Sequence, residues 1–490
     1  MTISKSKKKF TLDVSWVFMG MVIIFFLHFF QNPILARFLG PDGLGLFSMT
    51  TIIAGFVISV VGYGVNATIV KYVAEYKDNK PEINAIVSSG LLAMIILGSG
   101  LSGILFILSD SLACLFNMPS LSFLLKIYAF IFPFSLAYEV IMGLFNGLRE
   151  MKYHSFITIF QGVLTFSFIL TFLFWGFGVE GALAGMMLAV MASLGISAII
   201  MRKLIHFAVS KNKKIIKKLV AFSSRLMLAN SMTIINNQVA ILLIGYFMTA
   251  TDVGYYAVAV SFSRFFWRIP ESMQRIAYPA TSDYWAKSKF DSLNKMIDKS
   301  MKYSACLLLI VGLGTWFFAK DIVVFLFGDV FIHAVLPLQI LVIGTVLFGI
   351  YIPIGSTLPG IGRPDLSFKI GVVAATASVV LNILLIPRIG ITGAALATIS
   401  SFIILAVLSI YFIIKLTKIK IDVRWFTSAF TITFLAMAVF YATSEWINEY
   451  IIGSIILCIY ASIIFLFFFT KEDKEIFKDL IRSIIPKRFG

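Results

Sequence analysis

The stretch LARFLGPDGLGLF, residues 35–47, separates two apolar runs that are each long enough to cross a membrane. The runs cover roughly 14–36 and 46–69, and a helix needs about 20 apolar residues to span a bilayer. The chain of 490 residues is 59% hydrophobic and 13% charged, with a mean hydropathy of +0.96. Soluble domains are about 45–50% apolar and about 25% charged. We therefore predict an all-α polytopic membrane protein.

Apolar segments of membrane-spanning length recur along the whole chain, and we count about fourteen of them. Their bounds are uncertain by about two to four residues. The predicted spans are 14–36, 46–69, 85–108, 121–147, 155–177, 180–201, 224–248, 254–279, 300–319, 333–357, 367–386, 391–414, 425–443 and 450–469.

The basic residues give the orientation of these spans. If the N-terminus is cytoplasmic, only Arg37, Lys320 and Arg388 of the 41 Lys and Arg residues lie outside. Thirty-three are assigned to cytoplasmic segments, and the remaining five are assigned to spans: Lys126, Arg225, Arg264, Arg268 and Arg275. This distribution follows the positive-inside rule. We expect both termini in the cytoplasm, and we attribute the net charge of +17 to topology and to anionic inner-leaflet lipids rather than to nucleic acid.

Three stretches in the first half of the chain resemble three in the second half, in the same order. LARFLGPDGLGLF at 35–47 resembles IGYFMTATDVGYY, 209 residues later. FNGLREMK at 145–152 resembles PGIGRPDL, 214 residues later, which aligns Arg149 with Arg363. GVEGALAG at 178–185 resembles GITGAALA, 212 residues later. Ordered matches at nearly one spacing indicate an internal repeat.

Each repeat contains six spans, and an even number gives both copies the same orientation in the membrane. We predict two six-helix lobes in a parallel repeat, with a substrate site near the midplane between them. Basic segments with helical apolar stripes are expected on the membrane surface, both between the lobes and in the tail. The predicted domains are an N-lobe (1–205), a cytoplasmic basic linker (206–223), a C-lobe (224–415), two added spans (416–470) and a cytoplasmic amphipathic tail (471–490).

The eighth span carries an unusual set of charges. Its charged residues are spaced i, i+4, i+7 and i+11, so a continuous helix places them on one face about 60° wide: Arg264, Arg268, Glu271 and Arg275. Glu271 can pair with Arg268 or Arg275, which leaves about two positive charges on this face. Pro270 can bend the helix between Arg268 and Arg275. Charges inside the bilayer are rare and mark binding sites, so we expect an anion-binding face here.

Three other spans have polar faces that correspond pairwise under the repeat. At the offset of 209, the positions aligned with the arginine face are small or polar: Gly55, Ser59, Gly62 and Asn66. His28 of the first span aligns with Asn237 of the seventh. We expect a water-accessible cavity between the lobes, with interhelical hydrogen bonding as the alternative use of these side chains. The further predicted substrate-binding residues are His28, Gln31, Asn32, Ser59, Asn66, Asn230, Thr233 and Asn237.

Glu139, within the fourth predicted span, has two interpretations. Its carboxylate can pair with Lys126 or another cation, or it can carry a coupling ion such as a proton. His28 has similar alternatives, because a histidine titrates near neutral pH when it is accessible and stays neutral when it is buried and hydrogen-bonded.

The sequence lacks the motifs of several enzyme classes. It has no G-x-x-x-x-G-K-[ST], no H-E-x-x-H and no C-x-x-C, so ATP hydrolysis at a P-loop and zinc chemistry of those types are not indicated. Cys114, Cys306 and Cys458 are far apart and form no metal-binding or disulfide pattern. We expect no cofactor, no metal and no enzymatic activity.

Four motifs resemble those of a known family: ARFLGPDGLGLFSM, KYVAEY, GVEGALAG and GIGRPDLSF. They resemble the polysaccharide-biosynthesis exporters, in the superfamily that also holds multidrug exporters and the lipid II flippase. The resemblance implies a V-shaped, two-lobed fold that alternates between inward and outward openings. It also implies a cationic central cavity, and Arg264 and Arg268 match the arginines of such a cavity by position. His28 and Gln31 stand where the lipid II flippase has an arginine.

The leading hypothesis from this resemblance is a flippase for surface polysaccharide biosynthesis. It would move a polyprenyl-(di)phosphate-linked oligosaccharide from the cytoplasmic to the outer leaflet by alternating access. The implied partners are this lipid-linked oligosaccharide, anionic inner-leaflet lipids and, as candidates, a polysaccharide polymerase and glycosyltransferases.

Two alternatives remain beside this hypothesis. A cation-coupled multidrug or organic-cation antiporter needs an acidic cavity, whereas five cations are assigned to the predicted spans and the only acids beyond their end residues are Glu139 and Glu271. A membrane-bound glycan-modifying enzyme or scaffold would need larger outside loops than the sequence provides.

Overall fold

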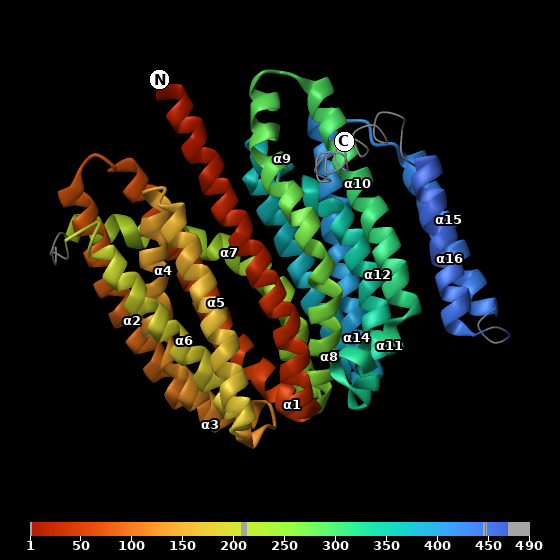
Figure 1. The fold of residues 1–490 in the computed structure, drawn as a ribbon, viewed down its shortest axis with the longest axis horizontal. Coiled ribbons are helices and arrows are strands. Elements are labelled where there is room, and N and C mark those ends of the chain that lie inside the picture. The colour runs from red at the N-terminus through yellow and green to blue at the C-terminus, as the bar shows by residue number, and fades with distance from the viewer. Residues whose placement is uncertain (1, 207–212, 444–445, 447, 469–490) are drawn as a thin grey trace, which may run out of the picture. The chain divides into compact units, whose positions relative to one another are not determined.

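The protein is helical throughout the part that the structure describes. This computed structural model describes residues 2–206, 213–443, 446 and 448–468, and no β-strand occurs among them. Figure 1 labels most of the α-helices. Among the shorter elements, η1, η2 and η3 are 3₁₀-helices and η4 is a π-helix. In chain order, the elements are α1 (Thr2–Glu75), α2 (Lys80–Leu115), α3 (Pro119–Ala129), α4 (Ile131–Gly147), α5 (Met151–Phe174), α6 (Gly178–Met201), α7 (Lys213–Phe247), α8 (Ala250–Ser263), η1 (Arg264–Trp267), α9 (Arg268–Ala286), α10 (Phe290–Phe317), α11 (Ala319–Phe327), η2 (Asp329–Ala334), α12 (Val335–Tyr351), η3 (Ile352–Ile354), α13 (Thr357–Gly360), α14 (Pro364–Thr417), α15 (Val423–Thr443), α16 (Glu449–Ile463) and η4 (Ile464–Phe468).

Within the described residues, each predicted span coincides with a helix or with consecutive helical segments. α1 contains the first two predicted spans, and α14 contains the eleventh and twelfth. The fourth span is split into α3 and α4, which are bent by 44°. By length and composition, nine of the described helices could cross a membrane, or ten if α3 and α4 form one span. The predicted all-α polytopic class is therefore confirmed.

Glycines mark the breaks inside the two longest helices. Gly40 has φ 65° and is followed by Pro41, at the predicted boundary between the first and second spans. Gly390 has φ 63° and breaks α14 at the boundary between the eleventh and twelfth. Both are in the left-handed region, which glycine adopts without the clash of a Cβ. Each long helix is therefore broken where the sequence predicts a turn between two spans.

The backbone at the third repeat match is the same in both copies. Gly178 and Gly390, aligned at an offset of 212, have φ values of 56° and 63°. Three residues later, a Cβ on Gly181 would overlap Phe177, and a Cβ on Gly393 would overlap the carbonyl oxygen of Leu385. Both copies therefore use one glycine for the turn and a second for close packing of the helix that follows.

The second repeat match needs a correction of one residue. The N–H of Arg149 donates to Asn146 O at 3.0 Å, and the N–H of Gly362 donates to Pro359 O at 3.0 Å. Arg149 and Gly362 also share a left-handed backbone, with φ values of 58° and 82°. Arg149 is therefore equivalent to Gly362, and its predicted alignment with Arg363 is wrong by one residue. The backbone hydrogen bonds define this turn, not the arginine side chain.

α1 and α8 approach each other at two glycines that the repeat relates. A Cβ on Gly45 would overlap the carbonyl oxygen of Ala250, and a Cβ on Gly254 would overlap that of Pro41. At the offset of 209, Gly45 corresponds to Gly254 and Pro41 corresponds to Ala250. The contact is thus reciprocal between the two segments of the first repeat match.

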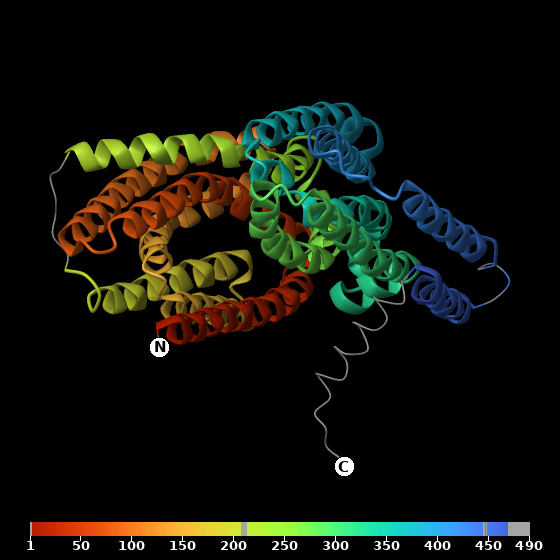
Figure 2. The same ribbon diagram turned by 90° about the horizontal axis from the view of Figure 1, so that it is seen from above.

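The described helices form two compact units, and the first runs from the N-terminus to Ser261, with 324–337 and 371–401. Its core lies between α1, α2 and α4, with Ile69, Val87 and Val140 almost fully buried. Figure 1 shows α5 and α6 as neighbours, and Figure 2 shows α7 alongside the second half of α1. Because α7 and α8 pack against α1, this unit has different boundaries from the predicted N-lobe, and the two lobes stay a prediction.

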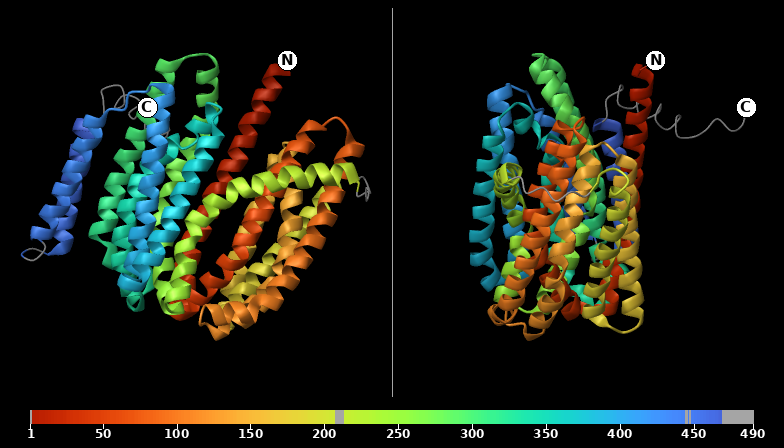
Figure 3. Two further views of the ribbon diagram at one scale, coloured as in Figure 1. Left: turned by 180° about the vertical axis from the view of Figure 1, so that it is seen from behind. Right: turned by 90° about the vertical axis from the view of Figure 1, so that its left-hand side faces the viewer.

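The second unit contains 262–323, 338–370 and the described residues from Phe402 onward. Trp267, Ile352 and Phe402 form a buried cluster on which Phe348 packs. α15 and α16 lie side by side in this unit, as Figure 3 shows in blue. The predicted tail at 471–490 lies outside the described residues, as do residues 207–212 of the predicted linker.

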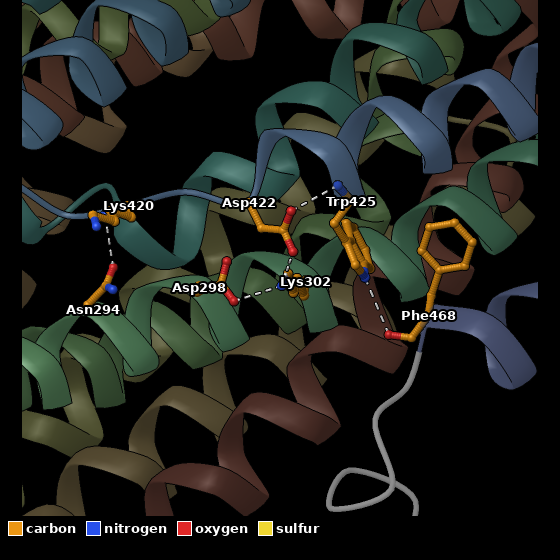
Figure 4. A network of polar contacts seen from close by, with 7 residues as sticks. All are labelled: Asn294, Asp298, Lys302, Lys420, Asp422, Trp425 and Phe468. Carbon is orange, nitrogen blue, oxygen red and sulfur yellow. Dashed lines mark hydrogen bonds and ion pairs between the residues drawn. The ribbon is translucent and has the colours of Figure 1, made fainter.

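An ion network connects the segment before α15 to α10, and Figure 4 shows its members. The Lys302 ammonium lies 2.9 Å from Asp298 and 3.1 Å from Asp422. Trp425 N–H donates to Asp422 Oδ1 at 3.1 Å, which caps the first turn of α15. Asp422 thus caps α15 and also forms an ion pair with Lys302 of α10, which connects the start of α15 to α10.

Candidate functional site

The predicted arginine face starts in a 3₁₀ turn. Arg264 lies in η1, whereas Arg268, Glu271 and Arg275 lie in α9. A 3₁₀-helix has 3.0 residues per turn, so Arg264 is rotated by about 80° from its position in a continuous α-helix. The face predicted at α-helical spacing is therefore divided between Arg264 and the three residues of α9.

Pro270 does not bend the helix at the predicted place. The change from 3₁₀ to α geometry falls before Arg268, not between Arg268 and Arg275. Pro270 occupies the first turn of α9, where backbone N–H groups have no partner within the helix. The proline therefore fits there without loss of a helical hydrogen bond, two residues after the start of α9 at Arg268.

Arg264 lies over an anchored indole ring. Its guanidinium carbon is 5.7 Å from the ring centroid of Trp267, which fits a cation–π contact. Trp267 is buried, and its Nε1–H donates to the carbonyl of Thr345 at 2.9 Å. The same ring packs on Phe348 and Phe402, with centroid distances of 5.1 and 5.3 Å. This aromatic support restricts the half-buried Arg264 side chain.

Arg268 and Glu271 form an ion pair within this set, at 3.4 Å. The two side chains are 62% and 37% exposed, so the pair is weak and open to exchange for a stronger ligand. Arg275 is exposed on the same helix. Three guanidinium groups and one carboxylate therefore share the segment from Arg264 to Arg275, as the sequence predicts.

The predicted polar residues of the first unit have different exposures. Gln31 is buried, whereas His28, Asn32 and Ser59 are exposed. Asn237 on α7 is half-buried. The side chains of Asn230 and Thr233 lie outside the described residues.

Asn66 is in contact with an acid. Its Nδ2 donates to Glu139 Oε2 at 2.9 Å and to the backbone oxygen of Glu139 at 3.1 Å. Gly62, one turn earlier on α1, faces the same side chain. Half of the small and polar face predicted on the second span therefore packs against α4.

Lys126 pairs with Asp110 and not with Glu139, the acid considered as its partner from the sequence. Its ammonium lies 2.8 Å from Asp110 Oδ1 and 2.9 Å from Asp110 Oδ2. This ion pair joins α3 to α2, so the pairing of Lys126 with Glu139 is wrong. Asp110 lies five residues before the end of α2 and Lys126 lies seven residues after the start of α3, so the short connection between these helices brings the two side chains to similar heights.

Sequence reasoning overlooked two residues that shape these contacts. Trp267 lies three residues after Arg264, a spacing that brings side chains together in a helix. Asp110 lies near the end of an apolar segment and was assigned no role. Within the described chain, no group of three or more His, Cys, Asp or Glu residues could hold a metal.

Most of the chain matches known membrane transporters. Residues 10–285, more than half of the chain, match the family described as polysaccharide biosynthesis protein. Residues 225–387 match the family described as MatE.

Three curated relatives cover different parts of the chain. It is 27% identical to the uncharacterized membrane protein MJ1068 of Methanocaldococcus jannaschii, over 56% of each chain. It is 28% identical to the probable low-salt glycan biosynthesis flippase Agl15 of Haloferax volcanii, over 36% of this chain and 38% of Agl15. It is 22% identical to the probable flippase AglR of the same organism, over 83% of this chain and 82% of AglR. The chain thus spans about half or less of the first two relatives.

A solved structure has the same fold. The lipid II flippase MurJ in an inward closed conformation aligns with a TM-score of 0.71, over 96% of this chain and 100% of that one. The sequence identity is 15%, so this likeness concerns the fold.

Proposed function

The chain belongs to the polysaccharide biosynthesis protein family of membrane transporters, and from this premise we propose that it flips a lipid-linked oligosaccharide. The substrate is an oligosaccharide on a polyprenyl phosphate or diphosphate carrier, which moves from the cytoplasmic to the outer leaflet of the cell membrane. The relatives named as flippases support this class of substrate. The two lobes predicted from the repeat, 1–205 and 224–415, are the parts that move.

The observation that carries the proposal is the excess of guanidinium groups between Arg264 and Arg275. A guanidinium donates two parallel hydrogen bonds to a phosphate, and these charge-assisted bonds are stronger than neutral ones. Arg264 is restricted by Trp267, so less side-chain entropy is lost when it binds an anion. Arg268 can exchange its exposed contact with Glu271 for a phosphate oxygen.

The same residues favour this proposal over a cation exporter. An organic cation is repelled by a segment that holds three arginines and a single carboxylate. The family match over residues 10–285 is also the longer of the two matches.

The test is export of a surface glycan in cells that depend on this protein. We expect the double variant Arg264→Ala/Arg268→Ala to lose export while its amount in the membrane stays normal. Arg388→Ala is a matched control, because Arg388 is exposed and lies in a predicted outside turn. Normal export by the double variant, at normal protein level, rejects the proposal.

A further inference from the structure

Glu139 and Asn66 form a carboxylate–amide pair between two helices of the first unit. Asn66 Nδ2 donates to Glu139 Oε2 at 2.9 Å and also to the Glu139 carbonyl at 3.1 Å. Glu139 lies at the middle of α4, eight residues from each end. At about 1.5 Å per residue it is roughly 12 Å from either end of the helix. A carboxylate therefore lies inside a membrane-spanning segment.

The pair is half-buried, and α1 and α4 pack closely beside it. A Cβ on Gly62 would lie 3.1 Å from Glu139 Cγ. One turn beyond Glu139, a Cβ on Gly143 would lie 3.0 Å from the carbonyl oxygen of Asn66. These two contacts bring the backbones of α1 and α4 close together beside the pair, while the half-buried Glu139 side chain stays accessible to a proton.

Glu139 differs from two other acids of the described chain in the charge of its partner. Asp110 is paired with Lys126, and Glu271 is paired with Arg268. The side-chain partner of the Glu139 carboxylate is instead a neutral amide. An acid next to a cation stays ionised, whereas an acid next to a neutral amide can also be neutral.

The titratable groups on the helices packed against α4 do not provide the Glu139 carboxylate with a cationic partner. Within the described chain, α2 has none between Glu82 and Asp110, and α6 has none after Glu180 until it ends at Met201. In the described part of these helices, the carboxylate forms no ion pair or hydrogen bond with the titratable groups nearest to it in sequence on the packed helices. These groups are Tyr138 on α4 itself, Tyr63, Lys71 and Tyr72 on α1, and Lys152, Tyr153 and His154 on α5.

The internal repeat gives the same contrast from the sequence. At the offset of 209, Gly62 aligns with Glu271 and Asn66 aligns with Arg275. In the second copy, a carboxylate and guanidinium groups share one helix. In the first copy, α1 provides a glycine and an amide, and α4 provides the carboxylate. Each copy of the repeat thus has an acid near this position: Glu271 is paired with the cationic Arg268, and Glu139 is paired with the neutral Asn66.

The geometry favours a proton over a metal cation as the ligand of this pair. A hard cation requires several oxygen ligands, but Asn66 directs N–H groups at both the carboxylate and the carbonyl of Glu139. A protonated carboxyl group keeps one oxygen as an acceptor and gains an O–H donor. Oε2 can therefore accept from Asn66 in both states while the proton binds the other oxygen, Oε1.

We propose that Glu139, held by Asn66 beside Gly62, is a proton-binding site that couples transport to the proton gradient. Binding of a proton removes the negative charge of Glu139 from the α1–α4 interface without breaking its hydrogen bond to Asn66. The inference adds a coupling ion to the proposed function, and it can fail while that function stands.

The direct test is infrared difference spectroscopy of the purified protein in lipid nanodiscs, between alkaline and acidic buffers. We expect a protonated-carboxyl C=O band on acidification that is lost in Glu139→Gln and retained in Glu271→Gln. In Asn66→Leu the band should shift to higher frequency, because the C=O loses a hydrogen-bond donor. This second variant tests the site even if Glu139→Gln does not fold.

Two results would overturn the site. One is a band that is the same in wild type, Glu139→Gln and Asn66→Leu. The other is a titration of the band that moves when Na⁺ replaces choline at constant ionic strength, which would identify a sodium site.

The coupling is tested separately, by glycan export in cells treated with a protonophore. We expect export by the wild type to be lost on treatment, and residual export by Glu139→Gln to be unaffected. Wild-type export that persists without a proton gradient overturns the coupling and leaves the flippase proposal intact. Loss of export in the arginine double variant tests that proposal alone.

Discussion

Gly45 of α1 and Gly254 of α8 are equivalent in the internal repeat, and each lies directly against a backbone carbonyl of the other's segment. Gly45 faces Ala250, Gly254 faces Pro41, and the two contacted residues are themselves equivalent. A pair of contacts with this reciprocity has the local form of a two-fold axis. The two copies therefore meet at the same surface of each, which requires a residue without a side chain at both positions.

Substitution of either glycine should separate α1 from α8. In Gly45→Ala or Gly254→Ala, the new methyl group overlaps a carbonyl oxygen that belongs to rigid helical backbone. Overpacking of this kind costs about 1–3 kcal/mol or more. We expect a lower Tm of the purified protein in detergent.

Gly103→Ala is the control for these variants, since nothing lies within 4 Å of a Cβ at that position of α2. Its Tm should equal or slightly exceed that of the wild type. Equal Tm values for all three variants would mean that the close approach is absent in solution.

Trp267 should affect both stability and export. Trp267→Phe keeps an aromatic ring but loses the bond from Nε1–H to Thr345 O, which is worth about 1 kcal/mol. Trp267→Ala also removes the packing on Phe348 and Phe402, at about 3–5 kcal/mol. Thermal unfolding measures this order, and glycan export should decrease in the same order because Arg264 loses its support.

An exposed tryptophan provides the comparison. Trp446 is 86% exposed, so Trp446→Ala should change neither the Tm nor glycan export. If Trp267→Ala exports as well as Trp446→Ala does, the indole ring does not position Arg264.

The attachment of α15 should depend on pH through Asp422. The ammonium of Lys302 and the N–H of Trp425 hold the pKa of Asp422 below its ordinary value. The unfolded pKa is about 3.9, so the pair stabilises the fold above that pH, and this stabilisation is lost as the pH falls through the folded pKa. Because Asp422 is half-exposed, the effect should be below about 1 kcal/mol.

The measurement compares wild type with Asp422→Asn by thermal unfolding across pH. The difference in Tm should be present at neutral pH and vanish in acid. A difference that is constant over the whole range would exclude the ion pair as its source.

Lys126 should be independent of Glu139 and coupled to Asp110. The Lys126–Asp110 distance is 2.8 Å, whereas Lys126 and Glu139 share no partner in the described contacts. In double-mutant cycles on unfolding free energy, Lys126→Ala with Glu139→Gln should be additive within about 0.3–0.5 kcal/mol. Lys126→Ala with Asp110→Ala should deviate from additivity beyond that margin. The reverse pattern would restore the pairing expected from sequence.

Hydropathy and charge predict most of the fold, because the bilayer constrains segment length and loop charge independently of neighbouring helices. The predicted turn between the first two spans falls at Gly40, since glycine and proline in sequence mark backbone conformation directly. The one-residue error between Arg149 and Arg363 arose because side-chain identity was used where hydrogen bonding defines the turn.

The site is less predictable, because partners come from other elements. Asn66 and Glu139 were both identified from sequence as polar residues in apolar spans, but their contact depends on how α1 packs on α4. Arg264 is rotated away from the other arginines by a 3₁₀ turn. The sequence pattern was interpreted with α-helical spacing throughout, and it contains no signal for a change to 3₁₀ geometry.

The turn shared by Arg149 and Gly362 bears on how the two halves diverged after duplication. Gly362 has nothing within 4 Å of a Cβ, and its counterpart already carries a long side chain in the same left-handed conformation. A left-handed non-glycine residue costs about 1–2 kcal/mol, and the described chain tolerates it at Asn117, Arg149, Ser288 and Lys418. The turn therefore constrains its backbone hydrogen bonds more than the residue at its left-handed position, which was free to differ between the halves.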